Sequence, residues 1–217
     1  MAIGFIFDLD GVITDTAEYH FRAWKKLADE EGIPFTREDN EALRGVSRRE
    51  SLRRLLKGRP IDEATAEAWM ARKNADYRAL LAEITPDDLL PGARAFLEAA
   101  RAAGIKVGLA SASRNAPDVI ASLQIGALFD VIGDGTSVVR TKPAPDLFVW
   151  VAGGFGLPVK ACVVFEDAAA GVEAALAARM PSVGIGPVER VGQAGLVCDG
   201  LHAITVEQAA ALVTGAG

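Results

Sequence analysis

The residues with the clearest chemical potential are Asp8 and Asp10, two carboxylates spaced two positions apart. They follow residues 3–7 (IGFIF), an apolar run typical of a strand buried on both faces of a parallel sheet. In extended backbone both side chains point the same way, beyond the strand's carboxyl end, where open α/β sheets bind ligands. Such a pair either binds a divalent cation, or one carboxylate acts as the nucleophile and the other as a general acid/base. Many short DxD matches are only strand ends before a capped helix, but the buried strand favours chemistry here.

The segment after this pair is predicted to be helical. Gly11 allows the backbone to turn. Thr14, Asp15 and Thr16 offer N-caps for a helix over 16–31, and Glu18 is placed for a capping box from Asp15. Further N-cap signals at Thr36 with Asp39 and at Ser47 with Glu50, breaks at Gly45 and Gly58–Pro60, and a long helix over 62–83 continue the pattern. The sequence therefore predicts a small helical bundle inserted after the first strand.

Beyond Pro86 helices alternate with buried strands, a pattern that predicts right-handed crossovers and a parallel sheet. Strands are expected at 105–110, 129–132, 162–165, 182–185 and 196–198. The predicted fold is α/β, a doubly wound, Rossmann-like parallel sheet with a small α-helical cap domain. The core domain is expected to comprise 1–14 and 86–217, and the cap domain 15–85.

Composition limits the functional classes. With 217 residues, half of them hydrophobic, the chain can bury one core and a smaller appendage, and its net charge of −6 argues against a nucleic-acid partner. No apolar run is long enough for a membrane span, and the N-terminus lacks the basic start of a signal peptide. Cys162 and Cys198 lie in apolar contexts typical of reduced thiols. We expect a cytoplasmic monomer with no membrane association.

Charge is concentrated in the predicted cap. Residues 18–83 hold 14 basic and 13 acidic side chains, whereas the rest of the chain holds 9 basic and 16 acidic ones. Solvated faces of amphipathic helices would explain the density. The difference in sign suggests in addition that the cap meets an anion.

Polar groups follow the other main strands too. Ser111 begins the run SASRN before a predicted helix, where hydroxyls and backbone amides form a natural phosphate site, and Glu166 and Asp167 follow the strand 162–165. N-capping or a solvated loop would explain either alone. Parallel strands, however, bring these groups and Lys142 to one edge. We expect Mg²⁺ to neutralise some carboxylates, a phosphate to bind beside it, and aspartates to supply a nucleophile and a proton relay.

The stretches FDLDGVITDT, SASRN, TKPAPD and FED resemble, in order, the four motifs of the haloacid dehalogenase superfamily. The cap stretches TAEYHFRAWKKLADEEG, LRGVSRRES and ARKNADY closely resemble the β-phosphoglucomutase family within it. The match spans nearly the whole chain. The cap stretches are the more specific ones, because many phosphatases share the core motifs.

The resemblance implies roles for the core residues. Asp8 would be the nucleophile that becomes phosphorylated, and Asp10 the general acid/base whose backbone carbonyl also contacts Mg²⁺. Glu166 and Asp167 would bind the metal together with Asp8. The transferring phosphoryl group would be held by Ser111 and Lys142, the latter followed by a cis proline.

The resemblance also implies roles around the cap. Arg48, with Ser113 and Asn115, would hold the second phosphate of the sugar, although most surface arginines are only solvated. Arg114 stands where the family has lysine and has a different geometry. His20 and Lys73 would link cap closure to Asp10, although His20 alone would indicate a packing histidine. The sugar would be lined by Gly45, Val46 and Ser47, and the closed site completed by Thr16 and Trp24, the latter also typical of a helix core.

The function implied is Mg²⁺-dependent interconversion of β-glucose 1-phosphate and glucose 6-phosphate, with β-glucose 1,6-bisphosphate as intermediate and activator. The alternative is a sugar-phosphate phosphatase that uses the same core with water as acceptor. A non-catalytic sensor of sugar phosphates would need a damaged motif, and none is visible.

Overall fold

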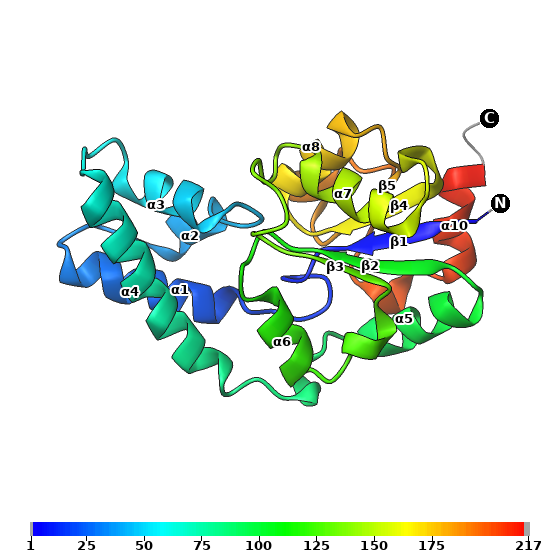
Figure 1. Cartoon of the computed structure of the whole chain (residues 1–217), viewed down its shortest axis with the longest axis horizontal. Helices are drawn as coiled ribbons and strands as arrows, with labels where there is room; N and C mark the ends of the chain where they lie inside the picture. The colour runs from blue at the N-terminus through cyan, green and yellow to red at the C-terminus, as the bar shows by residue number, and fades with distance from the viewer. Residues whose placement is uncertain (1, 215–217) are drawn as a thin grey trace.

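The computed structural model, which describes residues 2–214, contains a six-stranded parallel sheet of order β3-β2-β1-β4-β5-β6 (Figure 1). Its strands are β1 (Gly4–Phe7), β2 (Lys106–Ala110), β3 (Val131–Gly133), β4 (Cys162–Glu166), β5 (Ser182–Ile185) and β6 (Leu196–Cys198). β1 lies between β2 and β4, with Phe7 paired to Leu109 on one side and to Phe165 on the other. The predicted doubly wound parallel sheet is confirmed.

Helices connect the strands and cover the sheet. The α-helices are α1 (Ala17–Glu30), α2 (Arg37–Glu41), α3 (Arg48–Leu56), α4 (Glu63–Leu81), α5 (Ala93–Ala102), α6 (Ala116–Ser122), α7 (Asp146–Phe155), α8 (Ala169–Ala177), α9 (Val188–Val191) and α10 (Val206–Thr214). Single 3₁₀ turns are η1 (Pro86–Asp88), η2 (Gly126–Leu128), η3 (Val159–Ala161) and η4 (Leu201–Ala203).

The central strand β1 contributes to both apolar layers because its side chains alternate between the two faces. Phe5 and Phe7 pack with α5, α6 and α10, whereas Ile6 packs with α7 and α8, the helices above the sheet in Figure 1. Phe7 stacks on Phe165 with ring centroids 4.5 Å apart. Each fully buried phenylalanine stabilises the fold by about 1.5–3 kcal/mol, so this uninterrupted apolar run holds β1 and its polar end rigidly in the sheet.

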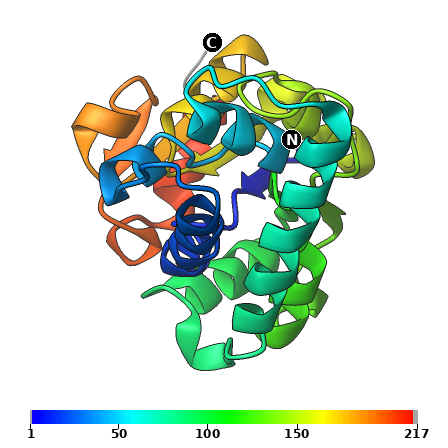
Figure 2. The ribbon, with the colours of Figure 1, turned by 90° about the vertical axis from the view of Figure 1, so that its left-hand side faces the viewer.

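Helices α1–α4, the cap helices, lie beyond the carboxyl ends of the strands (Figures 1 and 2). They have an apolar cluster of their own, in which Trp24 and Leu27 of α1 pack with Leu55 of α3 and Met70 of α4. Two chain segments connect the cap helices to the sheet, and they run side by side. Thr14 forms a β-bridge with Leu89 and its hydroxyl donates to the backbone oxygen of Asp88 at 2.7 Å.

Most predicted helix starts are correct, but the capping box expected at the first helix is absent. The capping box of Thr36 and Asp39 is present, and Ser47 accepts from the backbone N–H of Glu50 at 3.3 Å. The expected box of Asp15 and Glu18 is wrong. α1 has Thr16 as its N-cap, because the Glu18 carboxylate pairs with Arg37 at 2.7 Å and Asp15 accepts only from the N–H of Ala17.

The remaining differences concern the second half of the chain. β3 begins two residues later than predicted, and both α9 and α10 went unpredicted. Cys162 and Cys198 are free thiols, as expected. Between residues 2 and 214, no helix has the length and apolar character needed to cross a membrane.

Candidate active site

Three carboxylates meet at the carboxyl ends of β1 and β4. Asp8 follows β1, Glu166 is the last residue of the neighbouring strand β4, and Asp167 follows it. All three are almost fully buried, and each offers an oxygen within 4.8 Å of the others. The backbone N–H of Asp8 donates to the oxygen of Phe165 at 2.9 Å, which extends the strand pairing to the site itself. The predicted convergence of strand ends is therefore present.

Lys142 lies between two of these carboxylates. Its Nζ donates to Asp8 Oδ1 at 2.5 Å and to Glu166 Oε2 at 2.7 Å, with no part of the lysine side chain exposed. Burial alone would lower the pKa of Lys142, but the charges of Asp8 and Glu166 raise it. The peptide bond from Lys142 to Pro143 is cis, as predicted. The lysine therefore stays charged and offsets part of the acidic cluster.

Asp167, the third carboxylate of the cluster, is paired with two arginines. Arg44, in the loop before α3, donates to Asp167 Oδ2 at 3.1 Å. Arg190 of α9 donates through Nε to the backbone oxygen of Asp167 at 2.6 Å, and its Nη2 lies 3.6 Å from Oδ2. One arginine thus comes from the cap and one from the sheet domain. Sequence reasoning missed both.

The buried cluster fits a hard divalent cation. Asp8, Glu166 and Asp167 supply only oxygen ligands, the kind that a hard cation prefers, and an oxygen of each lies within reach of one ion. Burial raises the pKa of Glu166 and, together with the nearby Asp8 charge, that of Asp167. A cation bound here would favour the ionised forms.

This arrangement predicts that stabilisation by Mg²⁺ depends on pH. A carboxyl whose pKa is raised on folding keeps a proton that the unfolded chain has released, so its contribution to stability falls as pH rises from about 4 to 7. Mg²⁺ must displace more of those protons at pH 5.5 than at pH 7.5, because burial raises the pKa of Asp167 to about 7 and that of Glu166 to about 8. At 100 times its Kd, Mg²⁺ should raise Tm by roughly 5–10 °C at pH 7.5, and by clearly less at pH 5.5.

The measurement is the difference in Tm with and without Mg²⁺ at each pH. His20, whose lowered pKa acts with the opposite sign in this window, cancels from that difference. Asp167→Asn is the matched variant and should lose most of the Mg²⁺-dependent rise. An equal rise at both pH values in the natural protein would contradict a carboxylate metal site.

Asp10 belongs to a separate hydrogen-bonded chain. The Thr16 hydroxyl donates to Asp10 Oδ1, and the buried Tyr77 hydroxyl donates to Thr16 Oγ1 at 3.1 Å. Burial, and then the charge of Asp8, raise the pKa of Asp10 to about 7. A carboxyl with a pKa near neutrality can both accept and return a proton.

His20 and Lys73 lie on the cap side of this chain. Lys73 Nζ is 2.9 Å from His20 Nδ1, and it sits over the rings of Trp24 and Tyr77 at 5.0 and 4.4 Å from their centroids. Burial lowers the pKa of both His20 and Lys73, and the charge of Arg48 lowers both further. His20 and Lys73 are thus in direct contact, and Trp24 is both a core residue of the cap helices and part of the cavity wall.

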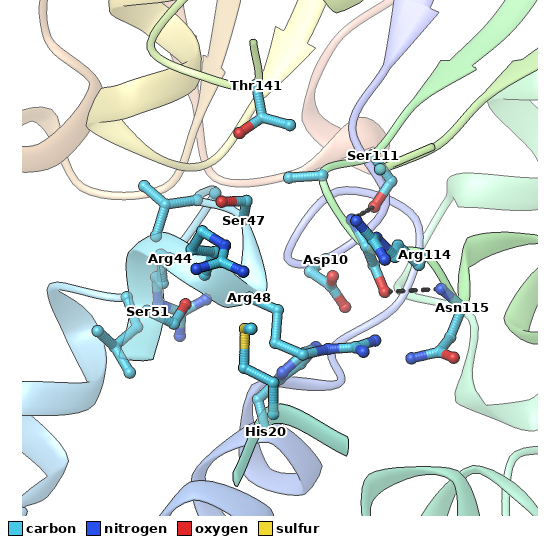
Figure 3. A pocket seen from close by; sticks show the side chains of 18 of the residues that line it. Asp10, His20, Arg44, Ser47, Arg48, Ser51, Ser111, Arg114, Asn115 and Thr141 are labelled. Carbon is cyan, nitrogen blue, oxygen red and sulfur yellow. Dashed lines mark hydrogen bonds between the residues drawn. The ribbon is translucent and has the colours of Figure 1, made fainter. Parts of the chain in front are cut away.

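A cavity of about 650 Å³ lies between the cap helices and the ends of the strands. In Figure 3 Asp10 lies between cap residues such as Arg44 and Ser47 and the core residues Ser111 and Arg114. The predicted site residues that line it are Asp8, Asp10, His20, Trp24, Gly45, Val46, Ser47, Arg48, Lys73, Ser111, Ser113, Arg114, Asn115 and Asp167. Thr16, Lys142 and Glu166 are buried and do not line the cavity: Thr16 donates to Asp10, and Lys142 donates to Asp8 and to Glu166.

A second part of the cavity wall is cationic, and we call it the cationic end. Arg48 of α3 and Arg114, in the loop after β2, have no ion pair with any residue between 2 and 214. Burial, and then the charge of Arg114, lower the pKa of Arg48. The loop itself is ordered by Ser111 Oγ, which accepts from the Ser113 N–H, and Ser113 Oγ, which accepts from the Asn115 N–H. Two uncompensated guanidinium groups make this end suitable for an anion.

Gly45 explains how the cap loop approaches the acidic end. Its φ of +71° suits glycine, and a Cβ there would lie 2.9 Å from the Ala168 Cβ. Besides Arg44 and Arg190, sequence reasoning missed Asn74 and Tyr77, which contact site residues from α4. The helical spacing of Lys73 and Tyr77 was an available signal for Tyr77.

The fold and the acidic cluster together define the class of the protein. The model for haloacid dehalogenase-like hydrolases matches residues 4–179, and the chain belongs to this family. The acidic cluster lies at the strand ends that carry the motifs of that superfamily. The resemblance drawn from the sequence is confirmed.

Individual members of the family show which kind of enzyme the chain is most similar to. The chain is 44% identical over 206 residues to "Beta-phosphoglucomutase" of Bacillus subtilis, and the aligned region covers 93% of this chain and 91% of that protein. A crystal structure of β-phosphoglucomutase from Clostridium difficile matches with a TM-score of 0.95 and 40% identity, over 99% of this chain and 98% of the other. "Phosphorylated carbohydrates phosphatase" of Thermotoga maritima is 32% identical over 80% of both chains.

Proposed function

We propose that the chain is a Mg²⁺-dependent β-phosphoglucomutase, which interconverts β-glucose 1-phosphate and glucose 6-phosphate through phosphorylated Asp8 and β-glucose 1,6-bisphosphate. The observation that carries the proposal is the polarity of the cavity. Its wall includes Asp8, which lies beside Lys142, and it also includes Arg48 and Arg114, which form no ion pair within residues 2–214. A sugar with a phosphate at each end suits such a cavity. The similarity to the mutases of B. subtilis and C. difficile supports the same choice.

In the first transfer, phosphorylated Asp8 donates its phosphoryl group to the C6 oxygen of β-glucose 1-phosphate. Asp10 takes the hydroxyl proton, held in position by Thr16. The bisphosphate then turns over, so that its C1 phosphate faces Asp8. The Asp8 carboxylate attacks the phosphorus of the C1 phosphate, and the bond between that phosphorus and the oxygen on C1 breaks. Asp10 returns the proton to the oxygen on C1. Atoms and protons balance over the cycle.

Other groups stabilise the transferring phosphoryl charge. Lys142 Nζ, already beside the attacking oxygen of Asp8, can donate to the phosphoryl oxygens, and the Ser111 hydroxyl lines the same end. Mg²⁺ bound by Asp8, Glu166 and Asp167 would supply positive charge to the transferring group. Ser111 directly follows β2 and the Lys142 side chain is fully buried, so these donors need little reorganisation during transfer.

A phosphatase would use the same core, so the mutase must exclude water while Asp8 is phosphorylated. The pair of His20 and Lys73 comes from two cap helices and lies next to the chain through Thr16 to Asp10. Arg48 makes closure of the cap depend on a second phosphate, which water lacks. These cap features favour the mutase over the phosphatase.

The experiment is a comparison of products. β-Glucose 1-phosphate with Mg²⁺ and a trace of bisphosphate should yield glucose 6-phosphate with little free phosphate during early turnover. The α anomer should be a poor substrate, because its phosphate leaves the ring on the other face. Free phosphate that equals or exceeds glucose 6-phosphate would overturn the mutase and support the phosphatase related to the T. maritima protein.

Arg48→Ala should separate substrate recognition from chemistry. Charge-assisted hydrogen bonds contribute about 1.5–3 kcal/mol, so kcat/KM for β-glucose 1-phosphate should fall roughly 10–150-fold. Phosphorylation of Asp8 by acetyl phosphate, which has no second phosphate, should change much less. Arg53→Ala on the same helix, which removes only an exposed pair with Glu50, is the control. Equal losses with both donors would make Arg48 a structural residue.

A further inference from the structure

The cationic end of the cavity also includes a contact from Asn74, a residue of α4 that the mechanism above does not use. Its side-chain oxygen Oδ1 accepts from Arg48 Nη2 at 2.7 Å and from Asn115 Nδ2 at 2.9 Å. Arg48 belongs to the cap helix α3, whereas Asn115 is the N-cap residue of α6, in the part of the chain that forms the sheet and that we call the sheet domain. We call these three residues the Asn74 clasp.

The orientation of the Asn74 amide follows from its partners. Arginine has no acceptor, and the Asn115 nitrogen that faces Asn74 donates. A flipped Asn74 would place its own NH₂ against two donors. Its carbonyl is therefore the group that fixes both side chains, each of which lines the cavity while Asn74 stands behind them.

We propose that Asn74 is a positioning residue that couples cap closure to recognition of the phosphate that is not transferred. The clasp can form only when the cap lies against the sheet domain, because its two donors come from the two parts. Once formed, it holds Arg48 and Asn115 in one geometry and removes the entropy cost of ordering a long arginine on binding. This inference rests on the proposed function, in which the cationic end binds that phosphate.

A neutral acceptor is suited to this role. A carboxylate at position 74 would hold the same two donors, but it would pair with the Arg48 charge that the phosphate needs. Asparagine aligns the guanidinium group without neutralising it. Burial and the neighbouring Arg114 lower the pKa of Arg48, because both disfavour its positive charge. The negative charge of a bound phosphate would favour it, and no carboxylate would compete for the same guanidinium group.

The test uses Asn74→Asp and Asn74→Ala, with steady-state kinetics of the full protein. Asn74→Asp should raise KM for β-glucose 1-phosphate by at least about 10-fold, with a smaller change in kcat, since the clasp persists but Arg48 is neutralised. Asn74→Ala should lower kcat/KM by about 10-fold or more and increase the share of free phosphate, since closure loses its link. Both variants should phosphorylate Asp8 with acetyl phosphate within about 3-fold of the natural rate.

Arg78→Ala is the matched control, because Arg78 of the same helix reaches Asp118 of the sheet domain at 3.7 Å without lining the cavity. If Arg78→Ala raises KM as much as Asn74→Asp, general docking of the cap is responsible and the inference fails. Natural KM in both Asn74 variants, or equal losses with acetyl phosphate, would also overturn it. The Kd of glucose 6-phosphate, measured by calorimetry, tests the role of Asn74 independently of turnover. A higher Kd in Asn74→Asp would support that role even if the natural protein proved to be a phosphatase.

Discussion

Replacing Asp8 by asparagine should lower turnover of β-glucose 1-phosphate by at least about 10⁴-fold, the scale on which single nucleophile removals act. Asparagine has nearly the same shape, but its amide cannot form the acyl phosphate. The amide oxygen can still accept from Lys142, which also keeps its partner Glu166. The fold should therefore persist, with Tm within about 4 °C of the natural protein. Product formation and circular dichroism on the same sample measure both expectations.

The control for this change is Asp15→Asn, an exposed carboxylate seven positions further along the same segment. Its oxygen accepts only from the N–H of Ala17, a bond that asparagine can keep. Activity should stay close to natural. Labelled acetyl phosphate should transfer its phosphoryl group to the natural protein and to Asp15→Asn, but not to Asp8→Asn. Substantial activity or labelling in Asp8→Asn would exclude Asp8 as the phosphorylated residue.

The sheet and the acidic end of the site were predictable because both follow from local sequence plus one topological rule. Buried strands leave uninterrupted apolar runs, and parallel strands bring their carboxyl ends to one edge. Asp8, Glu166 and Lys142 each stand where a buried segment ends or turns, and the structure brings them into direct contact. No pairing information beyond this rule was needed.

Contacts between the cap and the sheet were less predictable, because no local pattern encodes which surface residues meet. Arg44 and Arg190 look like ordinary solvated arginines in the sequence, yet both contact Asp167 Oδ2, and both also pair with Glu41 Oε2. Asn74 likewise has no helical signal of its own, and its role depends on two partners distant in sequence. Such contacts become visible only when the placement of the cap is known.

Two differences between the predicted and observed helices, at α10 and at α1, have another cause. α10 had a readable start signal, since Thr205 and Gln208 form a reciprocal cap in which each side chain accepts from the backbone N–H of the other. At α1, in contrast, the local signal misled. The Asp15 and Glu18 spacing suits a capping box, but Glu18 finds Arg37 and the Thr16 hydroxyl serves Asp10. There the needs of the site override the local preference of the helix.

Lys142→Met should produce the second large effect, on stability and activity together. The lysine is the only cation that contacts both Asp8 and Glu166 among residues 2–214, and its side chain is fully buried. Methionine fills a similar volume but leaves two carboxylates crowded and unpaired. Removal of one partner from a buried ion pair costs about 3–5 kcal/mol. Loss of a donor to the transferring phosphoryl group should lower kcat by a further factor of about 10²–10³.

The stability loss has a specific electrostatic origin, which a second substitution tests. If it reflects uncompensated carboxylates, then adding Glu166→Gln to Lys142→Met should restore part of the free energy of unfolding, measured by urea denaturation in EDTA. Activity should not return, because Glu166 is also a proposed metal ligand. Lys160→Met, at an exposed position with no ion pair in residues 2–214, should change stability by less than about 0.5 kcal/mol. Simple addition of the two single losses would instead mean that Lys142 contributes through packing, for example against the Phe148 ring 4.8 Å from its Nζ.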